Sequence, residues 1–248
     1  MRNIKLVIEY DGTNYSGWQN QENAITVQEK IEDAIYKVTK EKVRLLGSGR
    51  TDSGVHALGQ VANFFTTSTI PGDKFKFVLN NVLPEDIAII ESEEVDLQFH
   101  SRFDAIGKRY KYRIYNGRMP RPIYRNYTSH YKHKLDLEKM KEASKYFLGT
   151  HDFASFMGSG AVVNSTIRTI YEIKIEKIDD FINITVEGDS FLRYMVRIIV
   201  GTLIKVGSCQ FQVDDIPKII NARDRNRAGK TAPPQGLYLE EVYYNNFR

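Results

Sequence analysis

The stretch of this sequence best suited to chemistry is Gly47–His56, Gly-Ser-Gly-Arg-Thr-Asp-Ser-Gly-Val-His, which lies between two predicted strands. Its three glycines allow tight turns and a close approach of the backbone to a ligand. They surround one carboxylate, Asp52, which follows Arg50 and Thr51. A neighbouring positive charge keeps a carboxylate ionised, and an ionised Asp can act as a nucleophile or an electrostatic stabiliser. A structural Arg–Asp pair that holds the turn explains the same residues equally well.

The cofactor sites that a glycine-rich stretch can form do not fit here. A dinucleotide-binding fingerprint opens a helix, whereas here the third glycine comes late and a strand follows. Gly229–Thr231 resembles the end of a phosphate-binding loop, but Asp224 stands where that motif requires glycine. Asp52 and His56 could ligate a metal, but no third ligand is evident. The sequence therefore predicts neither a nucleotide cofactor nor a metal.

A basic and aromatic segment, Gly107–Lys134, contains nine Lys or Arg residues and six tyrosines but no acidic residue. A second basic loop runs from Asn221 to Lys230, whereas acidic residues gather between Glu85 and Asp96. Cations can neutralise phosphates and rings can stack on bases, so this pattern favours a nucleic acid partner over a merely solvated face. The candidate RNA-binding residues are Lys108, Arg109, Lys111, Arg118, Arg121 and Arg125.

The composition is that of a soluble globular protein. The chain has 248 residues, of which 42% are hydrophobic and 27% charged, and its net charge is +4. The single cysteine, Cys209, excludes an internal disulfide. The most apolar stretch, Phe191–Val206, carries three cationic residues and is too short to span a membrane. The N-terminus enters a strand-like pattern rather than a signal peptide, so we expect a cytoplasmic protein that binds no membrane.

The hydrophobic pattern of the first half predicts the order β-α-β-β-α-β. Alternation over 4–10 is typical of a strand, and Ile31 and Ile35 share one face of a predicted helix. Thr26 and Glu29 have the spacing of a capping box at the start of that helix. The predicted elements are a strand at 4–10, a helix at 27–39, strands at 43–48 and 57–66, a helix at 72–80 and a strand at 87–95.

The second half repeats this order, which predicts an α+β fold of two pseudo-symmetric, ferredoxin-like or RRM-like halves. Two such units form antiparallel sheets, each with helices on one face. If the free faces join or face each other, they build a platform with a central cleft. The predicted domains are residues 1–103, with Asp52, and 104–248, with the basic segment. The second set of elements is a strand at 108–116, a helix at 136–147, strands at 170–177 and 181–188, a helix at 191–206 and a strand at 236–244.

Two arginines in the predicted helix 191–206 need an explanation. The helix is apolar nearly all round, as buried helices are, yet it carries Arg193 and Arg197 one turn apart. A guanidinium in such a helix needs an anionic partner or a path to water. We expect either that these side chains reach solvent at the helix edge, or that Arg197 points into the cleft and pairs with Asp52.

The motif around Asp52, Gly47–Ala57, strongly resembles the catalytic motif of the TruA family of tRNA pseudouridine synthases. The resemblance covers essentially the whole chain, because segments similar to the family's other motifs follow in order. Ser53, Ser190 and the pair Arg193-Tyr194 replace residues usual in the family, but none of them removes an implied catalytic residue. The matching segments are Tyr10–Gln19, Leu83–Ile87, Phe99–Phe103, Lys108–Tyr112, Gly149–Phe153, Met195–Arg197 and Gly236–Leu239.

The resemblance implies a reaction and a role for each of five residues. Asp52 would attack the target nucleotide at C6 of the uracil or at C1′ of the ribose; the glycosidic bond then breaks, the base rotates, and a bond re-forms through C5. Tyr110 would stack on the target base and help deprotonate C5, and Arg197 would pair with Asp52. Arg50 would hold the nucleotide out of its stack, and Leu237 would pack against the base.

The resemblance also implies a bent platform, no cofactor, a homodimer whose two subunits touch one tRNA, and target uridines on the 3′ side of the anticodon stem–loop. Two other functions stay open from the residues alone. The basic segment would suffice for a non-catalytic RNA-binding protein of two RRM-like modules. An Asp-dependent hydrolase of nucleosides or RNA would release free base or cut the strand.

Overall fold

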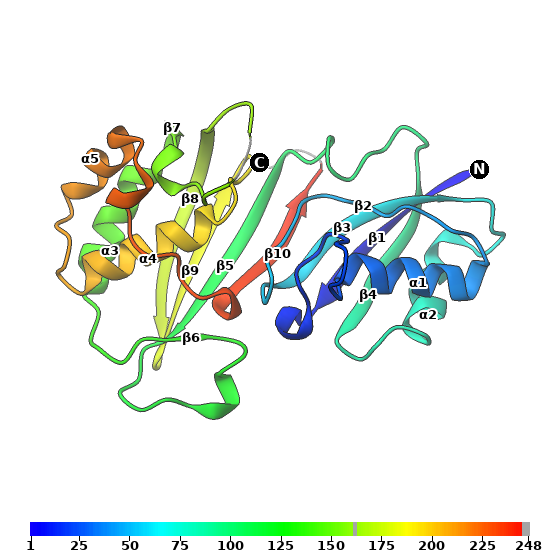
Figure 1. The fold of residues 1–248 in the computed structure, drawn as a ribbon, viewed down its shortest axis with the longest axis horizontal. Coiled ribbons are helices and arrows are strands. Elements are labelled where there is room, and N and C mark those ends of the chain that lie inside the picture. Colours follow the sequence, from blue (N-terminus) through cyan, green and yellow to red (C-terminus); the bar gives the residue numbers. More distant parts are fainter. Residues whose placement is uncertain (161–162, 245–248) are drawn as a thin grey trace. The chain divides into compact units, whose positions relative to one another are not determined.

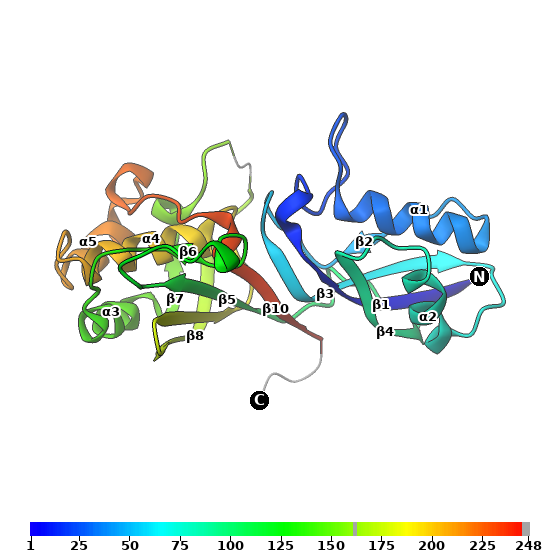
Figure 2. The same ribbon diagram turned by 90° about the horizontal axis from the view of Figure 1, so that it is seen from below.

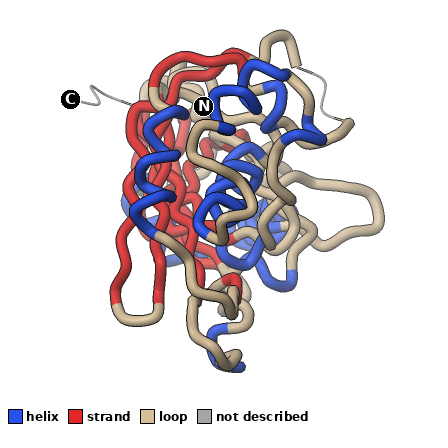
Figure 3. Tube along the Cα trace, turned by 90° about the vertical axis from the view of Figure 1, so that its left-hand side faces the viewer, coloured by secondary structure: helices blue, strands red, loops and turns tan. Residues whose placement is uncertain are grey.

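The computed structural model describes residues 1–160 and 163–244, which form two compact units. Among the described residues, the N-terminal unit comprises 1–106 and 238–244, and the C-terminal unit comprises 107–160 and 163–237. Each unit combines a sheet with helices (Figure 1). Figure 3 shows the helices, strands and loops in separate colours.

The N-terminal unit is built from β1 (Arg2–Tyr10), α1 (Val27–Thr39), β2 (Leu46–Gly47), β3 (His56–Thr66), α2 (Phe75–Asn80), β4 (Ile87–Val95) and β10 (Leu237–Tyr243). Its strands follow the order β4-β1-β3-β10, and β2 pairs with β3. β1 is antiparallel to both β3 and β4, whereas β10 is parallel to β3, with Tyr238 opposite His56. α1 lies along one face of this sheet (Figure 2).

Local sequence explains why β1 and α1 form where they do. Ile4, Leu6 and Ile8 alternate along β1 and are fully buried, as a strand with one face in the core requires. Thr26 caps α1, because its hydroxyl oxygen accepts a hydrogen bond from the Glu29 N–H at 3.4 Å. This hydrogen bond confirms the Thr26 half of the capping box predicted from the sequence.

The C-terminal unit is built from β5 (Gly107–Tyr115), β6 (Ser129–His130), α3 (Leu137–Ser144), β7 (Gly149–Asp152), β8 (Ile167–Ile178), β9 (Phe181–Gly188), α4 (Met195–Gly207) and α5 (Asp215–Ala222). The strand order is β5-β9-β8-β7, all antiparallel, and β6 pairs in parallel with β5. The helix predicted to be apolar nearly all round, α4, is buried along most of its length. No helix in the described part of the chain has the length and apolar character needed to span a membrane.

The α+β class predicted from the sequence is confirmed, and the differences in detail have local causes. The helix expected from residue 191 begins only at Met195, because Tyr194 has a left-handed φ of 64°. Arg193 therefore precedes the helix and does not share it with Arg197, which corrects the expectation of two arginines one turn apart. Both sheets, expected to be antiparallel, contain a parallel pair. α5 was not predicted, because its eight residues give only two turns of hydrophobic pattern.

Candidate active site

The candidate site residues are described one unit at a time, beginning in the N-terminal unit with the loop that carries Asp52. This Asp52 loop, residues 48–55, connects β2 to β3, and Asp52 itself is partly exposed. Arg50, two residues earlier, is exposed. The segment after β1, residues 11–19, is here named the cradle segment because it holds the loop.

The cradle segment fixes the Asp52 loop mainly through the backbone. The Trp18 N–H donates to the Thr51 carbonyl at 3.2 Å, and the Gly54 N–H donates to the Tyr15 carbonyl at 3.3 Å. The Ser53 hydroxyl donates to the same Tyr15 carbonyl at 3.1 Å. These bonds lie on both sides of Asp52, so its backbone position does not depend on its own side chain.

Two glycines allow the cradle segment and the loop to approach this closely. Gly17 has a φ of 94°, and a β carbon placed on it would lie 2.5 Å from the Thr51 carbonyl oxygen. A β carbon on Gly12 would overlap the carbonyl of Val55. Any side chain at either position would push the loop away, because the contact is with backbone that cannot rotate aside.

Buried hydrogen bonds hold the rest of the loop. The Tyr10 hydroxyl lies 2.7 Å from the Thr51 hydroxyl. Gln60 accepts from the Ser48 hydroxyl at 2.6 Å and donates to the Gly49 carbonyl at 2.9 Å. Burial raises the pKa of Tyr10 well above its usual value, and the hydrogen bond with Thr51 offsets part of that rise. Tyr10 is therefore neutral throughout the physiological range and supplies a hydroxyl rather than a charge.

His56 fixes the end of the loop, where β3 begins. Its ring is buried and stacks on Tyr238 with 4.8 Å between ring centroids. Its Nδ1 lies 3.1 Å from the Gly12 N–H and 3.1 Å from an Asp11 carboxylate oxygen. The first contact needs an unprotonated Nδ1 that accepts, and the second needs a protonated Nδ1 that donates. Both forms keep His56 attached to the cradle segment.

In the C-terminal unit the candidate residue Tyr110 lies on β5. It is 8% exposed, and its ring packs edge-on against Phe191 with 5.1 Å between centroids. Successive residues of a strand point to opposite faces, so Arg109 and Lys111 lie on the face of β5 opposite Tyr110. Arg109 forms an ion pair there with Glu187 on β9.

Arg197, near the start of α4, holds the chain that leads to Leu237. Its Nε donates to the Ala232 carbonyl at 2.8 Å, and the Ala232 N–H donates back to the Arg197 carbonyl at 3.0 Å. The Tyr194 ring lies 5.0 Å from the guanidinium carbon, a distance at which a cation is attracted to the ring face. These two hydrogen bonds between Arg197 and Ala232 fix both the arginine and the segment before Leu237.

Tyr112 holds the same segment from β5. Its hydroxyl donates to the Pro233 carbonyl at 2.8 Å, and its ring is fully buried against Gly236. Tyr112 therefore belongs to the core and cannot stack on a base, which corrects its inclusion among the rings available to RNA. The strand period could have shown this, because Tyr110, Tyr112 and Ile114 alternate with the cationic residues of β5. Leu237, at the end of the segment, is 5% exposed.

The predicted site residues thus fall into two groups. Asp52 and Arg50 belong to the N-terminal unit, and Tyr110, Arg197 and Leu237 belong to the C-terminal unit. The pairing of Arg197 with Asp52 stays a prediction. Sequence reasoning did not identify the residues that hold Arg197 in place, among them Tyr194 and Ala232. Nothing in these two residue types indicates that they contact an arginine.

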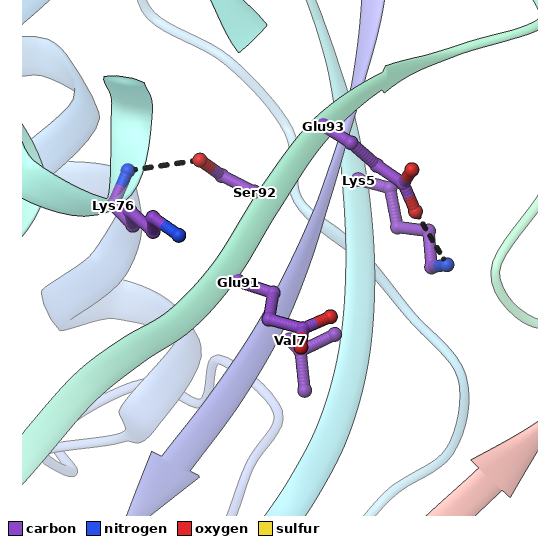
Figure 4. Close-up of a pocket in the computed structure, with 6 residues that line it drawn as sticks. All are labelled: Lys5, Val7, Lys76, Glu91, Ser92 and Glu93. Atoms are coloured by element: carbon purple, nitrogen blue, oxygen red, sulfur yellow. Dashed lines mark hydrogen bonds and ion pairs between the residues drawn. The ribbon is translucent and has the colours of Figure 1, made fainter. Parts of the chain in front are cut away.

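A surface hollow elsewhere in the N-terminal unit contains none of these residues. It lies over β1, β4 and α2 (Figure 4). Within it Lys5 and Glu93 form an ion pair of 2.8 Å. Among the described residues, no three His, Cys, Asp or Glu side chains are grouped so that they could hold a metal ion. The hollow is lined by Lys5, Val7, Lys76, Glu91, Ser92 and Glu93.

The family model for tRNA pseudouridine synthases matches this chain over residues 6–104 and 143–245. The chain therefore belongs to the tRNA pseudouridine synthase family. The family predicted from the motif around Asp52, and with it an isomerase that acts on tRNA, is confirmed.

Individual relatives match along nearly the full chain. It is 57% identical over 244 residues to tRNA pseudouridine synthase A of Acetivibrio thermocellus, covering 98% of this chain and 100% of that protein. It is 53% identical over 244 residues to tRNA pseudouridine synthase A of a Thermoanaerobacter species, with the same two coverages. It is 56% identical over 246 residues to tRNA pseudouridine synthase A 2 of Clostridium tetani, covering 98% and 99%.

Among solved structures, the crystal structure of the archaeal box H/ACA sRNP Nop10-Cbf5 complex aligns with a TM-score of 0.37 and 13% identity. The alignment covers 82% of this chain and 44% of that one.

Proposed function

We propose that this protein isomerises uridine to pseudouridine in the anticodon arm of tRNA, with Asp52 as the nucleophile. The observation that carries the proposal is the setting of Asp52: a partly exposed carboxylate on a loop whose backbone is fixed from both sides by the cradle segment. A rigidly held nucleophile lowers the barrier, because the cost of orienting it is met during folding.

The reaction rearranges bonds within one nucleotide. The bond between ribose C1′ and uracil N1 breaks, and a bond between C1′ and C5 forms after the base has rotated. C5 gives up its proton and N1 gains one, so the atoms balance without an oxidant, a reductant or a nucleotide cofactor. Asp52 attacks either C6 of the base or C1′ of the sugar, and both routes need the nucleotide flipped out of its stem, at a cost of a few kcal/mol.

The other candidate residues have roles that follow from their surroundings. Tyr110 is held by Phe191 with little freedom to move, as a ring that stacks on the target base and assists removal of the C5 proton must be. Arg197, fixed through Nε, pairs with Asp52 through the remainder of its guanidinium. Arg50 is exposed and holds the flipped nucleotide, and Leu237 packs against the base.

RNA binding is assigned to the cationic residues of the basic segment. Their phosphate contacts offset the cost of flipping the base. The enzyme acts as a cytoplasmic homodimer in which one tRNA touches both subunits. The RNA-binding residues are Lys108, Arg109, Lys111, Arg118, Arg121 and Arg125.

The decisive experiment maps pseudouridine in an unmodified tRNA transcript after incubation with wild type and with Asp52→Asn. New pseudouridine in the anticodon arm, formed only by wild type, supports the proposal, with tRNA affinity of the variant within about tenfold because no phosphate contact is removed. Asp33→Asn, which alters an exposed carboxylate on α1, is the matched control. Residual turnover of Asp52→Asn above a few per cent of wild type would contradict the nucleophile. Tight binding without any pseudouridine would instead indicate an RNA-binding protein.

A further inference from the structure

The loop between β5 and β6 displays large apolar side chains to solvent. In this arginine loop, residues 117–128, Ile123 is 82% exposed and Met119 is 70% exposed. Tyr124 and Tyr127 are also exposed. Apolar side chains this exposed and this close together in sequence mark an interaction surface rather than a solvated one. In Figure 1 the loop extends beyond β6 at the lower edge of the C-terminal unit.

The exposure is not the result of a poorly anchored loop. The Gly117 carbonyl lies 2.8 Å from His130 Nε2, and Arg121 Nε donates to the Tyr115 hydroxyl at 3.3 Å. The Thr128 N–H donates to the Tyr124 carbonyl at 3.0 Å. The start and the middle of the loop are therefore fixed to strands β6 and β5, and its end is fixed to the loop's own short turn.

A cluster of rings supports the loop from below. Tyr124 packs edge-on against Phe181 with 5.0 Å between centroids, and Tyr115 lies against Phe181 and His130 at 5.4 and 5.5 Å. Ile123, next to Tyr124 in a short 3-10 turn, is thereby held outward. Because the backbone of the loop is already ordered, covering Ile123 costs little further backbone entropy when a partner binds.

The charges around these side chains select the partner. Arg118, Arg121 and Arg125 are exposed on the same loop, and residues 107–134 contain no carboxylate. Asp180, in the turn between β8 and β9, is the carboxylate that acts on Arg121, so three arginines face one acid here and the excess charge is positive. An apolar tip with such an excess of cations is complementary to a nucleic acid, whose phosphates meet the arginines while an unstacked base meets the apolar surface. Apolar wedges of this kind, Ile and Met among them, are used by proteins that hold nucleic acid bases apart.

We propose that Met119 and Ile123 form a wedge that packs against an unpaired or unstacked base of the tRNA, at a nucleotide other than the one that reacts. Arg118, Arg121 and Arg125 bind the phosphates on either side of that base. The inference rests on the proposed tRNA substrate but not on the role of Asp52. The arginine loop also falls within residues 105–142, between the two stretches that match the family model.

The test measures tRNA affinity of the double variant Met119→Ser/Ile123→Ser over a series of salt concentrations. We expect affinity to fall about tenfold, as for loss of one base contact, with no change in the salt dependence because no charge is removed. The rate of pseudouridine formation at saturating tRNA should stay near that of wild type. Replacing Arg118, Arg121 and Arg125 together by Gln should instead lower the steepness of the plot of log affinity against log salt concentration by about two, because about two fewer counterions are released on binding.

Two controls distinguish loss of the wedge from a general loss of exposed apolar surface, and two measurements of folding accompany them. Ile178→Ser removes an isoleucine that is 61% exposed at the end of β8 and should leave affinity unchanged. A fully paired RNA duplex should bind wild type and the double variant equally, because it offers no unstacked base. Circular dichroism and the unfolding midpoint confirm that the variants are folded.

Three outcomes would overturn the wedge. Unchanged tRNA affinity in the double variant removes it, and an equal loss on tRNA and on duplex shows that no base is contacted. A change in the mass of the free enzyme in sedimentation, with tRNA affinity intact, assigns the loop to a contact between protein chains. A fall in affinity in a protein that makes no pseudouridine would leave the wedge standing while the proposed reaction fails.

Discussion

The two units hold their candidate site residues by different means. In the N-terminal unit the Asp52 loop is fixed mainly by hydrogen bonds between backbone groups and by glycines that allow close approach. In the C-terminal unit the segment before Leu237 is fixed by one backbone hydrogen bond and mainly by side chains, Arg197 on the Ala232 carbonyl and Tyr112 on the Pro233 carbonyl.

The difference decides which substitutions each region tolerates. A loop held by backbone can change its side chains without moving, provided that no β carbon is added at the points of contact. Ser53 illustrates this, because its hydroxyl adds one bond to the Tyr15 carbonyl and disturbs none of the others. A segment held by side chains depends on the shape and hydrogen-bonding groups of those side chains, so even a substitution that preserves charge should move it.

The largest effect is expected where the backbone contact leaves no room. Gly17→Ala combines a left-handed φ of 94° with a β carbon 2.5 Å from the Thr51 carbonyl oxygen. The Asp52 loop must shift, and a displacement of about 1 Å in a reacting group lowers the rate about 100-fold. Single-turnover formation of pseudouridine measures the loss.

Gly160→Ala is the matched control, since Gly160 also has a left-handed φ, 73°, but nothing lies within 4 Å of an added β carbon. It should cost only the backbone strain, about 1 kcal/mol, and retain full activity. If both variants lost activity equally, backbone strain rather than the contact with the loop would be the cause, and the comparison would fail.

A smaller effect is expected from Arg197→Lys in the C-terminal unit. Lysine keeps the positive charge but cannot donate from an Nε to the Ala232 carbonyl while also reaching an anion, because it lacks the guanidinium fork. We expect activity to fall about tenfold. Arg193→Lys, which alters an exposed arginine just before α4, should change little. Wild-type activity in Arg197→Lys would show that charge alone suffices and that side-chain geometry does not matter there.

Much of the fold could be predicted from the sequence because its signals are local. The periods of hydrophobic residues place α1, β4 and β9 at their observed bounds, 27–39, 87–95 and 181–188. The Asp52 loop was found for a similar reason, because three glycines and a carboxylate within ten residues are conspicuous without any knowledge of their neighbours.

The contacts that position the site could not be predicted, because they join residues far apart in the chain. Nothing in Tyr10 or Thr51 indicates that their hydroxyls meet 2.7 Å apart across 41 residues. The left-handed backbone of Tyr194 runs against the preference of a large side chain, and it shifted the start of α4. The composition of β5 shows tyrosines among cations but does not say which of them are exposed. In the strand, Tyr112 is buried in the core, and Arg109 lies on the opposite face, where it pairs with Glu187.

Tyr10→Phe tests one of the buried side-chain contacts that support the mainly backbone-held loop. It removes the Tyr10 hydroxyl and leaves the buried Thr51 hydroxyl without that partner, which should destabilise the protein by about 1 kcal/mol. Urea unfolding measures this, with Tyr36→Phe as the control because Tyr36 is exposed on α1. Activity should fall less than threefold, since the backbone bonds around Asp52 persist. A loss as large as that of Gly17→Ala would mean that the side chain, not the backbone, positions the loop.

A further effect is absent at neutral pH, appears only at alkaline pH and follows from the same hydroxyl. Burial raises the pKa of Tyr10 in the folded state, so above about pH 10 the unfolded chain loses this proton while the folded chain keeps it. The unfolded state then binds fewer protons, and the free energy of unfolding falls by up to about 1.4 kcal/mol per pH unit for this residue. Below about pH 10 both states hold the proton, and Tyr10 contributes no pH dependence.

Urea unfolding between pH 9 and 11 should therefore show a shallower decline in the free energy of unfolding for Tyr10→Phe than for wild type, whereas Tyr36→Phe should follow wild type. Parallel declines in all three proteins would mean that the Tyr10 hydroxyl ionises as readily in the folded chain as in the unfolded one, and that the cradle segment admits water to it.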